Sequence, residues 1–324
     1  MTSNSQTTGF HTVDVSCSLG VLKLRAQLLT NIRAYFKQED VLEVDTPILS
    51  HAMNTDPMLE SISITDLPPR WLATSPEFPM KRLLAAGSGS IYQVAKVFRA
   101  GESGRYHNPE FTMLEWYRLG WDDRKLAEEV VKVIKLALHV NGQKASKVEF
   151  VRYAQIFEEH TGLKLTDSLE TLLQHSAFQS LSSSLSHIEA IDWLFATVVQ
   201  PQMHKEHIVV VQDYPEFMSA LARLDPDDKQ IARRFEVFYS GVELANGYWE
   251  LVDPQEQRRR FEKEQGIRNE NGQNEGVLDQ RLLSALDGGL PDCAGVALGL
   301  DRLLMLVAGV DHIDHVLAFP SSIA

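Results

Sequence analysis

The side chains most able to do chemistry are concentrated between residues 98 and 118. Apolar residues at both ends of this stretch alternate with polar ones, as in β-strands, and Gly101 and Gly104 interrupt the chain between them. This pattern predicts an antiparallel hairpin. Its ionisable side chains include Arg99, Glu102, Arg105, His107, Glu110 and Glu115. Because an unpaired buried ion costs several kcal/mol, this much charge indicates either a bound ligand or a salt-bridged hairpin exposed to solvent.

A second group of acids lies in a predicted strand that reads VELANGYWE. Asn246, Tyr248 and Glu250 alternate along it and therefore face one side, whereas Glu243 would face the other side of an ideal strand. A bulge near Asn246 and Gly247 would bring Glu243 round to the same side. Two such carboxylates repel each other unless Mg²⁺ or a substrate ammonium neutralises them. The alternative is a solvated strand face, which the apolar neighbours disfavour.

Two further stretches predict the start of a helix. The stretch GVALGLDRLLMLV reads as a small-residue strand that turns at Gly299 into a helix carrying Arg302 in its first turn. Free N–H groups at a helix N-terminus bind phosphate, and an arginine there adds charge-assisted hydrogen bonds. In the stretch TSPEF, Ser75 is the expected N-cap, Pro76 the first helical residue and Glu77 a first-turn acid. This second signal requires no ligand.

The rest of the chain must position these groups. Residues 22–36 place apolar side chains at helical spacing, and residues 41–47 alternate like a strand and end in proline. Residues 122–205 are predicted to form a mostly helical insertion, and their histidines lack the spacing of metal ligands. Residues 1–14 are predicted to be a disordered lead, so we expect one catalytic domain over residues 15–324.

Composition excludes several classes of protein. A net charge of −13 over 324 residues argues against a broad nucleic-acid-binding face, which is normally basic. The N-terminus lacks the basic and apolar regions of a signal peptide, and no run of about 18 apolar residues predicts a membrane span. The two cysteines, Cys17 and Cys293, are too few for a disulfide framework. We therefore expect reduced thiols in a cytoplasmic protein that does not contact the membrane.

Together these motifs resemble the three motifs of class II aminoacyl-tRNA synthetases. Residues 22–47 correspond to motif 1, the charged hairpin to motif 2 and GVALGLDR to motif 3. The hairpin sequence RYHNPEFTMLEWY is closest to the lysyl enzymes, and within them to shortened paralogues that ligate β-lysine to elongation factor P. The resemblance covers roughly residues 19–320. One departure is that the family loop often runs Arg-Asn-Glu, whereas here Ala100 and Gly101 precede the acid, Glu102.

The resemblance implies an α+β fold, the class II synthetase catalytic core, in which helices flank an antiparallel sheet of six or seven strands. Motif 1 builds the dimer interface in that family, so we expect a homodimer. About fourteen polar residues precede the catalytic core, and we therefore expect no anticodon-binding domain.

The resemblance also implies ATP and Mg²⁺ as cofactors and assigns residues to them. Arg99 and Arg302 are the expected catalytic residues, and Glu243 and Glu250 the expected metal ligands. The residues implied for ATP are Arg99, Ala100, Gly101, Glu102, His107, Asn108, Phe111, Glu243, Leu244, Gly299 and Arg302. Those implied for the amino acid are Ser75, Pro76, Glu77, Glu115, Tyr117, Asn246, Tyr248, Glu250 and Ala297.

Ala297 indicates which amino acid is activated. The lysyl-tRNA synthetases that this chain resembles normally have glycine there, where the α-amino end of lysine lies against the backbone. A methyl group would crowd that end, whereas (R)-β-lysine carries its amine one carbon further along. We therefore predict a ligase that transfers (R)-β-lysine to elongation factor P and does not use tRNA. The alternatives are a tRNA-charging enzyme and a non-catalytic binding module, and the complete set of phosphate ligands disfavours the second.

Overall fold

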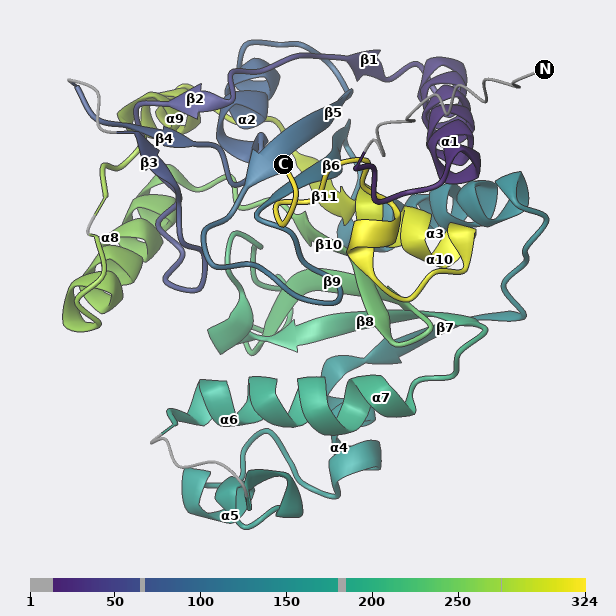
Figure 1. Ribbon diagram of the computed structural model, residues 1–324. Helices are drawn as coiled ribbons and strands as arrows, with labels where there is room; N and C mark the ends of the chain where they lie inside the picture. The colour runs from purple at the N-terminus through teal and green to yellow at the C-terminus, as the bar shows by residue number, and fades with distance from the viewer. Residues whose placement is uncertain (1–13, 65–67, 180–184, 275) are drawn as a thin grey trace, which may run out of the picture.

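The computed structural model describes residues 14–64, 68–179, 185–274 and 276–324. Of the predicted N-terminal lead, only Asp14 falls within them. The described residues form an eight-stranded sheet in the order β1-β5-β6-β11-β10-β9-β8-β7 and a small sheet in the order β2-β4-β3 (Figure 1). The strands are β1 (Leu42–Glu43), β2 (Leu49–Ser50), β3 (Ser63–Ile64), β4 (Arg70–Leu72), β5 (Ile91–Phe98), β6 (Glu110–Leu119), β7 (Lys147–Arg152), β8 (His207–Pro215), β9 (Ile231–Tyr239), β10 (Val242–Trp249) and β11 (Cys293–Gly299).

The large sheet corrects the prediction of six or seven antiparallel strands. The inner strands pair antiparallel, and β5 and β6 form the predicted hairpin. At the two edges, however, β1 pairs with β5 and β7 pairs with β8 in parallel. Of the strand predicted at residues 41–47, only Leu42 and Glu43 form β1, and an alternating pattern does not indicate the direction of pairing. Strand β7 lies within the insertion that was expected to be mostly helical, and its parallel pairing depends on a partner distant in sequence.

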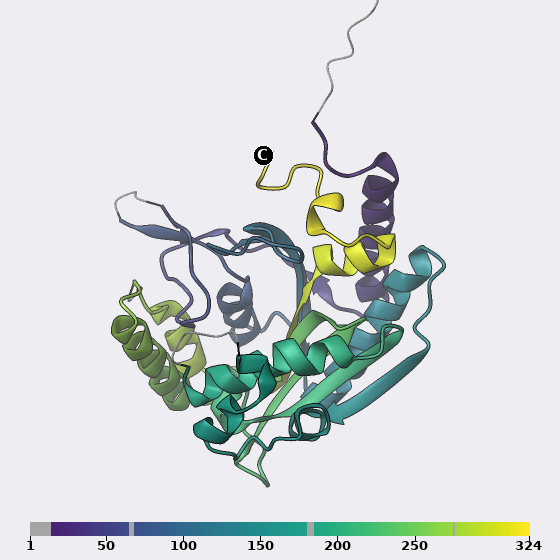
Figure 2. The ribbon, with the colours of Figure 1, turned by 60° about the horizontal axis from the view of Figure 1, so that its bottom comes forward.

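Helices cover both faces of the sheet (Figures 1 and 2). Within the described residues, no helix is both long enough and apolar enough to cross a membrane. The α-helices are α1 (Leu19–Gln38), α2 (Glu77–Ala85), α3 (Asp123–Val140), α4 (Tyr153–Thr161), α5 (Leu169–Leu173), α6 (His187–Leu194), α7 (Gln200–Gln202), α8 (Pro254–Glu270), α9 (Gln280–Asp287) and α10 (Leu300–Ala308). Four short elements join them: η1 (Ser176–Phe178), η2 (Phe195–Val199), η3 (Glu216–Met218) and η4 (Ile313–His315).

Helices α1, α3 and α10 pack on one face and form the main hydrophobic core with it. Phe36 of α1 stacks on Tyr92 of β5 at a ring distance of 4.4 Å and meets Trp116 of β6 edge-on. This aromatic cluster seats the motif 1 helix on the motif 2 hairpin. On the opposite face, α2 and α9 pack at one end of the sheet and α4 to α7 pack over β8 and β9, which leaves the middle strands free to line a cavity.

One buried carboxylate joins the three motifs. Asp301 in the first turn of α10 is 1% exposed. Its two oxygens accept hydrogen bonds from Arg25 of α1 and from the backbone N–H of Thr112 on β6. Because this carboxylate is withdrawn from water and has partners on both other motifs, it fixes the helix start at Gly299 relative to the hairpin.

Candidate active site

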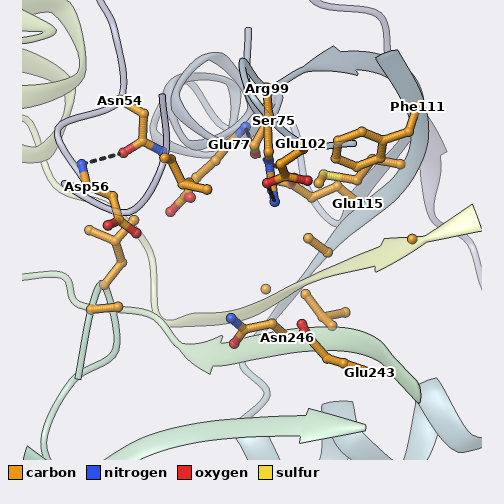
Figure 3. Close-up of a pocket in the computed structure, with 18 of the residues that line it drawn as sticks. Asn54, Asp56, Ser75, Glu77, Arg99, Glu102, Phe111, Glu115, Glu243 and Asn246 are labelled. Atoms are coloured by element: carbon orange, nitrogen blue, oxygen red, sulfur yellow. Dashed lines mark hydrogen bonds and ion pairs between the residues drawn. The ribbon is translucent and has the colours of Figure 1, made fainter. Parts of the chain in front are cut away.

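A cavity of about 240 Å³ lies over strands β6, β11 and β10. The pairing of these strands orders its floor in rows: Tyr117, Gly295 and Tyr248 form one row, and Glu115, Ala297 and Asn246 form the next. The row beyond begins with Met113 and Gly299. The cavity therefore has two ends, separated by the row that contains Ala297. Figure 3 shows Glu243 and Asn246 on one wall of the cavity and Arg99, Glu102 and Phe111 on the wall that faces it.

The end next to Gly299 is rich in cationic side chains. Arg302 donates to the backbone carbonyls of Tyr106 and Glu243, each at 3.2 Å. Its guanidinium also lies 2.7 Å from Nε2 of His107 and 3.6 Å from the Glu243 carboxylate. Burial and the Arg302 charge hold the pKa of His107 below its usual range, so the ring is neutral at pH 7.

Arg99 lies at the same end, where the hairpin strands separate. Its guanidinium is 3.4 Å from the Glu102 carboxylate and covers one face of the Phe111 ring at 5.1 Å. The backbone pairs Arg99 with Pro109 across the base of the loop. A flat nucleobase can stack on an exposed aromatic ring. Phe111 lines the cavity at the end that holds Arg99 and Arg302.

Glu243 reaches the cavity because β10 is irregular. Its pairing with β9 shifts register between Glu243 and Ala245. The expected bulge is therefore present, but earlier in the strand than Asn246 and Gly247. It has the predicted effect, since Glu243, Asn246, Tyr248 and Glu250 all line one cavity.

The opposite end of the cavity is acidic and buried. Glu115 belongs to the row of Ala297 but bonds toward this end: it is 2% exposed, and its two oxygens accept hydrogen bonds of 2.7 Å from Ser75 Oγ and Tyr117 Oη. Gly295 lets the side chains of Tyr117 and Glu250 lie close to its backbone, because a Cβ on it would be 2.3 Å from the Tyr117 ring and 2.4 Å from Oε1 of Glu250. Burial, with a contribution from Glu77, raises the pKa of Glu115 to about 8.

A buried lysine joins two of the predicted substrate ligands. Lys81 Nζ lies 2.6 Å from Oε1 of Glu77 and 2.7 Å from Oε2 of Glu250. Burial lowers the pKa of Lys81, but the two carboxylates outweigh this effect and hold the pKa above its usual value. The sequence analysis did not identify Lys81. The i,i+4 spacing of Glu77 and Lys81 indicated a helical ion pair, but nothing in it indicated Glu250.

Several predicted residues do not occupy their expected places. Pro76, not Ser75, is the N-cap of α2, and it does not line the cavity. Ser75 still accepts the Glu77 N–H at 2.9 Å, as an N-cap would. Ala100 and Gly101 are also absent from the lining, because the loop turns them away and Ala100 N donates to Glu60 O.

Asn108 has a structural position within the cavity wall. Its side-chain N–H donates to Glu110 O at 2.6 Å, and its Oδ1 accepts from Ser321 N at 3.0 Å. Both polar atoms of the amide are therefore engaged with backbone, and the side chain ties the hairpin loop to the C-terminal segment.

The two predicted metal ligands lie at opposite ends of the cavity. Glu250 follows Glu243 by seven positions along β10 and its end, a span of at most about 23 Å between Cα atoms at about 3.3 Å per residue. Glu243 faces Arg302, whereas Glu250 faces Lys81. The assignment of both acids to one metal ion stays a prediction, and in this structure Glu250 is paired with Lys81. No group of three or more His, Cys, Asp or Glu side chains within the described residues is arranged to hold a metal.

A loop before β3 adds residues that the sequence analysis missed. Asn54 and Asp56 line the cavity (Figure 3). Leu59 and Glu264 of α8 also line it. The fully buried Arg268 holds this loop by donating to the carbonyls of Asp56 and Leu59. These contacts join segments far apart in the chain, and no local motif marks them.

Comparison with known proteins places the chain in a family. The model of class II tRNA synthetases (D, K and N) matches residues 16–323. A protein of Vibrio atlanticus (strain LGP32) named elongation factor P--(R)-beta-lysine ligase is 46% identical over 311 residues, which cover 92% of this chain and 95% of that protein. Proteins of the same name from Vibrio parahaemolyticus and Histophilus somni (strain 2336) are 44% and 40% identical, over 95% and 94% of this chain and 98% and 96% of theirs.

The match spans all three motifs and both ends of the cavity. The mixed eight-stranded sheet, the charged hairpin and the strand-to-helix turn at Gly299 lie within the matched residues. The chain therefore belongs to the class II tRNA synthetase family of the D, K and N type.

Proposed function

We propose that this protein uses ATP to activate (R)-β-lysine as an adenylate and then transfers it to a lysine side chain of elongation factor P. The observation that carries the proposal is the two-ended cavity, cationic beside Gly299 and acidic beside Gly295. The names of relatives 40–46% identical over almost the whole chain support the same substrate and acceptor.

The first step joins two anions. An oxygen of the β-lysine carboxylate attacks the α-phosphorus of ATP, and pyrophosphate leaves with the electrons of the broken P–O bond. A carboxylic acid of pKa about 3–4 is already ionised at pH 7, so no general base is needed. What is needed is in-line positioning and neutralisation of charge. Arg99 would neutralise the carboxylate and α-phosphate, and Arg302 would neutralise the outer phosphates, which the neutral His107 ring would contact by hydrogen bonding.

The acidic end would hold the ammonium groups. Glu250 and Tyr117 suit the distal ammonium by charge and hydrogen bonding, and Glu77 suits the amine nearer the carboxylate. Asn246 Oδ1 is buried without a hydrogen-bond partner among the described residues, so it is available to a substrate N–H. Ala297 lies between the two ends, where its methyl would crowd an α-amine but clear a β-amine.

Glu243 fits a role in holding Mg²⁺. Magnesium is commonly bound by one or two carboxylates together with substrate phosphates, and Glu243 is the carboxylate beside Arg302. The ion would neutralise phosphate charge. Leu244 and Gly299 line the same end and would contact ATP through their backbone.

In the second step the acceptor amine attacks the carbonyl carbon of the adenylate. The new C–N bond forms the amide, AMP leaves with the electrons of the broken C–O bond, and the nitrogen loses a proton. Freeing a lysine lone pair at pH 7 costs roughly 4–5 kcal/mol, given a pKa near 10.4. The adenylate phosphate and a carboxylate of the site are the two candidate proton acceptors.

The proposal extends to assembly and location. Motif 1 leaves apolar side chains uncovered, among them Leu19 at 67% and Leu42 at 56% exposure, which supports a homodimer built on α1 and β1. Light scattering at micromolar concentration should show a dimer. The free, buried Cys17 and Cys293 and a translation-factor acceptor support a cytoplasmic enzyme.

Label transfer tests the proposed acceptor. Purified protein, ATP and labelled β-lysine are incubated with elongation factor P, with a variant of it lacking the acceptor lysine, or with tRNA. The proposal predicts label in the intact factor alone. Label in tRNA would favour the tRNA-charging alternative, and the absence of pyrophosphate exchange with any lysine would favour the non-catalytic one.

A further inference from the structure

Lys81 is a buried charged group of the acidic end that has no role in the proposed reaction. Its side chain is 3% exposed, and both of its ion-pair partners are carboxylates that the proposal gives to the substrate. A purely structural lysine would not need both partners to face the cavity, yet Glu77 and Glu250 both line it.

Lys81 binds only one oxygen of each carboxylate. It contacts Oε1 of Glu77 and Oε2 of Glu250. Oε2 of Glu77 accepts no hydrogen bond from any described residue, and Oε1 of Glu250 lies over Gly295, where a Cβ would be 2.4 Å from it. The lysine thus leaves one acceptor oxygen of each carboxylate for a ligand, and two acceptors suit a ligand with two ammonium groups.

We propose that Lys81 is a positioning residue that fixes, through Glu77 and Glu250, the two points at which the ammonium groups of the amino acid are held. The inference rests on the proposed function and deepens it. Lys81 occupies the bridging position between the two carboxylates, so a substrate ammonium cannot take that position. Each ammonium must instead bind its own carboxylate. The distance between the two carboxylates then selects the lysine isomer whose amines are separated by a matching distance.

The β-to-α ratio isolates this role. The two lysines carry the same charges and the same atoms and differ only in the position of one amine. The ratio of their kcat/KM values in pyrophosphate exchange therefore cancels both the general attraction of the pocket for cations and any loss of correctly folded enzyme. A merely structural lysine would not move this ratio.

The test compares wild type with Lys81→Met and Lys81→Gln. We expect the β-to-α ratio to fall at least tenfold in Lys81→Met through loss of activity with β-lysine, while KM for ATP stays within threefold. Lys81→Gln keeps two N–H donors, which protects folding if the methionine variant is unstable. The logarithm of the β-to-α ratio should fall by at least half in this variant. Lys96→Met is the matched control, because Lys96 is 46% exposed and pairs with Glu110 outside the cavity.

An unchanged ratio in a folded Lys81 variant would overturn the inference and leave the proposed function standing. If wild type itself activated neither lysine, the proposed function would fail before the variants were compared.

Discussion

The two ends of the cavity are built in different ways. At the cationic end the charged side chains are partly open to solvent, with Arg99 and Arg302 each 21% and Glu243 38% exposed. The ion pairs of Arg99 with Glu102 and of Arg302 with Glu243 are long, at 3.4 and 3.6 Å. At the acidic end Lys81 and Glu250 are 3% and 1% exposed, and their contact is 2.7 Å.

This difference separates binding from selection. Water screens charges at an open site, so side chains there can adjust around a ligand at small cost. A buried site lacks that compensation, and a ligand must supply partners at fixed points or leave polar groups unpaired. We therefore expect the cationic end to hold the triphosphate shared by the whole family, and the acidic end to decide which amino acid is used.

The largest effect is expected from removing an arginine of the cationic end. Arg302→Ala and Arg99→Ala should each lower pyrophosphate exchange by about 10²–10³, the usual loss for one donor that stabilises transition-state charge. Arg105→Ala is the matched control, because Arg105 lies on the same loop outside the cavity. If pyrophosphate exchange in either variant stayed within threefold of wild type, that arginine would not neutralise phosphate charge as proposed.

The next largest effect is expected at the opposite end. Glu250→Gln removes the charge offered to the distal ammonium. A hydrogen bond to a charged group contributes about 1.5–3 kcal/mol, so kcat/KM for β-lysine should fall about 10–150-fold. If the two ends act separately, KM for ATP should stay unchanged in this variant. An equal rise in KM for ATP and KM for β-lysine would show that they do not.

A change of similar size is expected in the row between the ends. Ala297→Gly removes the methyl that crowds an α-amine. A methylene-sized difference changes selectivity by about 10–200-fold, so activity with α-lysine should rise at least tenfold. Pyrophosphate exchange with both lysines measures it. If the ratio of kcat/KM values did not move, the methyl would not be the selector.

The smallest effect is a pH dependence confined to the acidic end. Burial raises the pKa of Glu115 to about 8 and that of Glu250 to about 7. Above the unfolded value of about 4.5 the native protein therefore binds more protons than the unfolded chain, and these groups lower the free energy of unfolding as pH rises from 5 to 8. Bound ammonium groups favour the ionised carboxylates. β-Lysine should therefore raise the melting temperature more at pH 8 than at pH 6.

A series of melting curves with and without β-lysine measures this dependence. Glu115→Gln should flatten it, because the amide does not titrate. If β-lysine raised the melting temperature of wild type equally at pH 6 and pH 8, titration of Glu115 and Glu250 would not be the cause.

The sequence predicted the parts of the site that local pattern controls. The β5–β6 hairpin, the shared parity of Asn246, Tyr248 and Glu250, and the turn at Gly299 all follow from spacing within one segment. The bulge at Glu243 was predicted in kind but not in place, because its position depends on the register with β9.

The parts that depend on contacts between distant segments were not predictable. Lys81 joins Glu250 across the fold, and Arg268 fixes a loop from the far side of the cavity. The parallel edge strands β1 and β7 likewise depend on partners that no periodicity identifies.

The central claim is that a single cavity presents a phosphate end and an amine end on either side of Ala297. A crystal structure with a non-hydrolysable β-lysyl-adenylate analogue tests it most directly. We expect the phosphate mimic beside Arg99, the adenine against Phe111, and the two ammonium groups on Glu77 and Glu250, with Lys81 still bridging these carboxylates. An analogue bound in the reverse direction, or an ammonium group that displaced Lys81 from between the carboxylates, would contradict it.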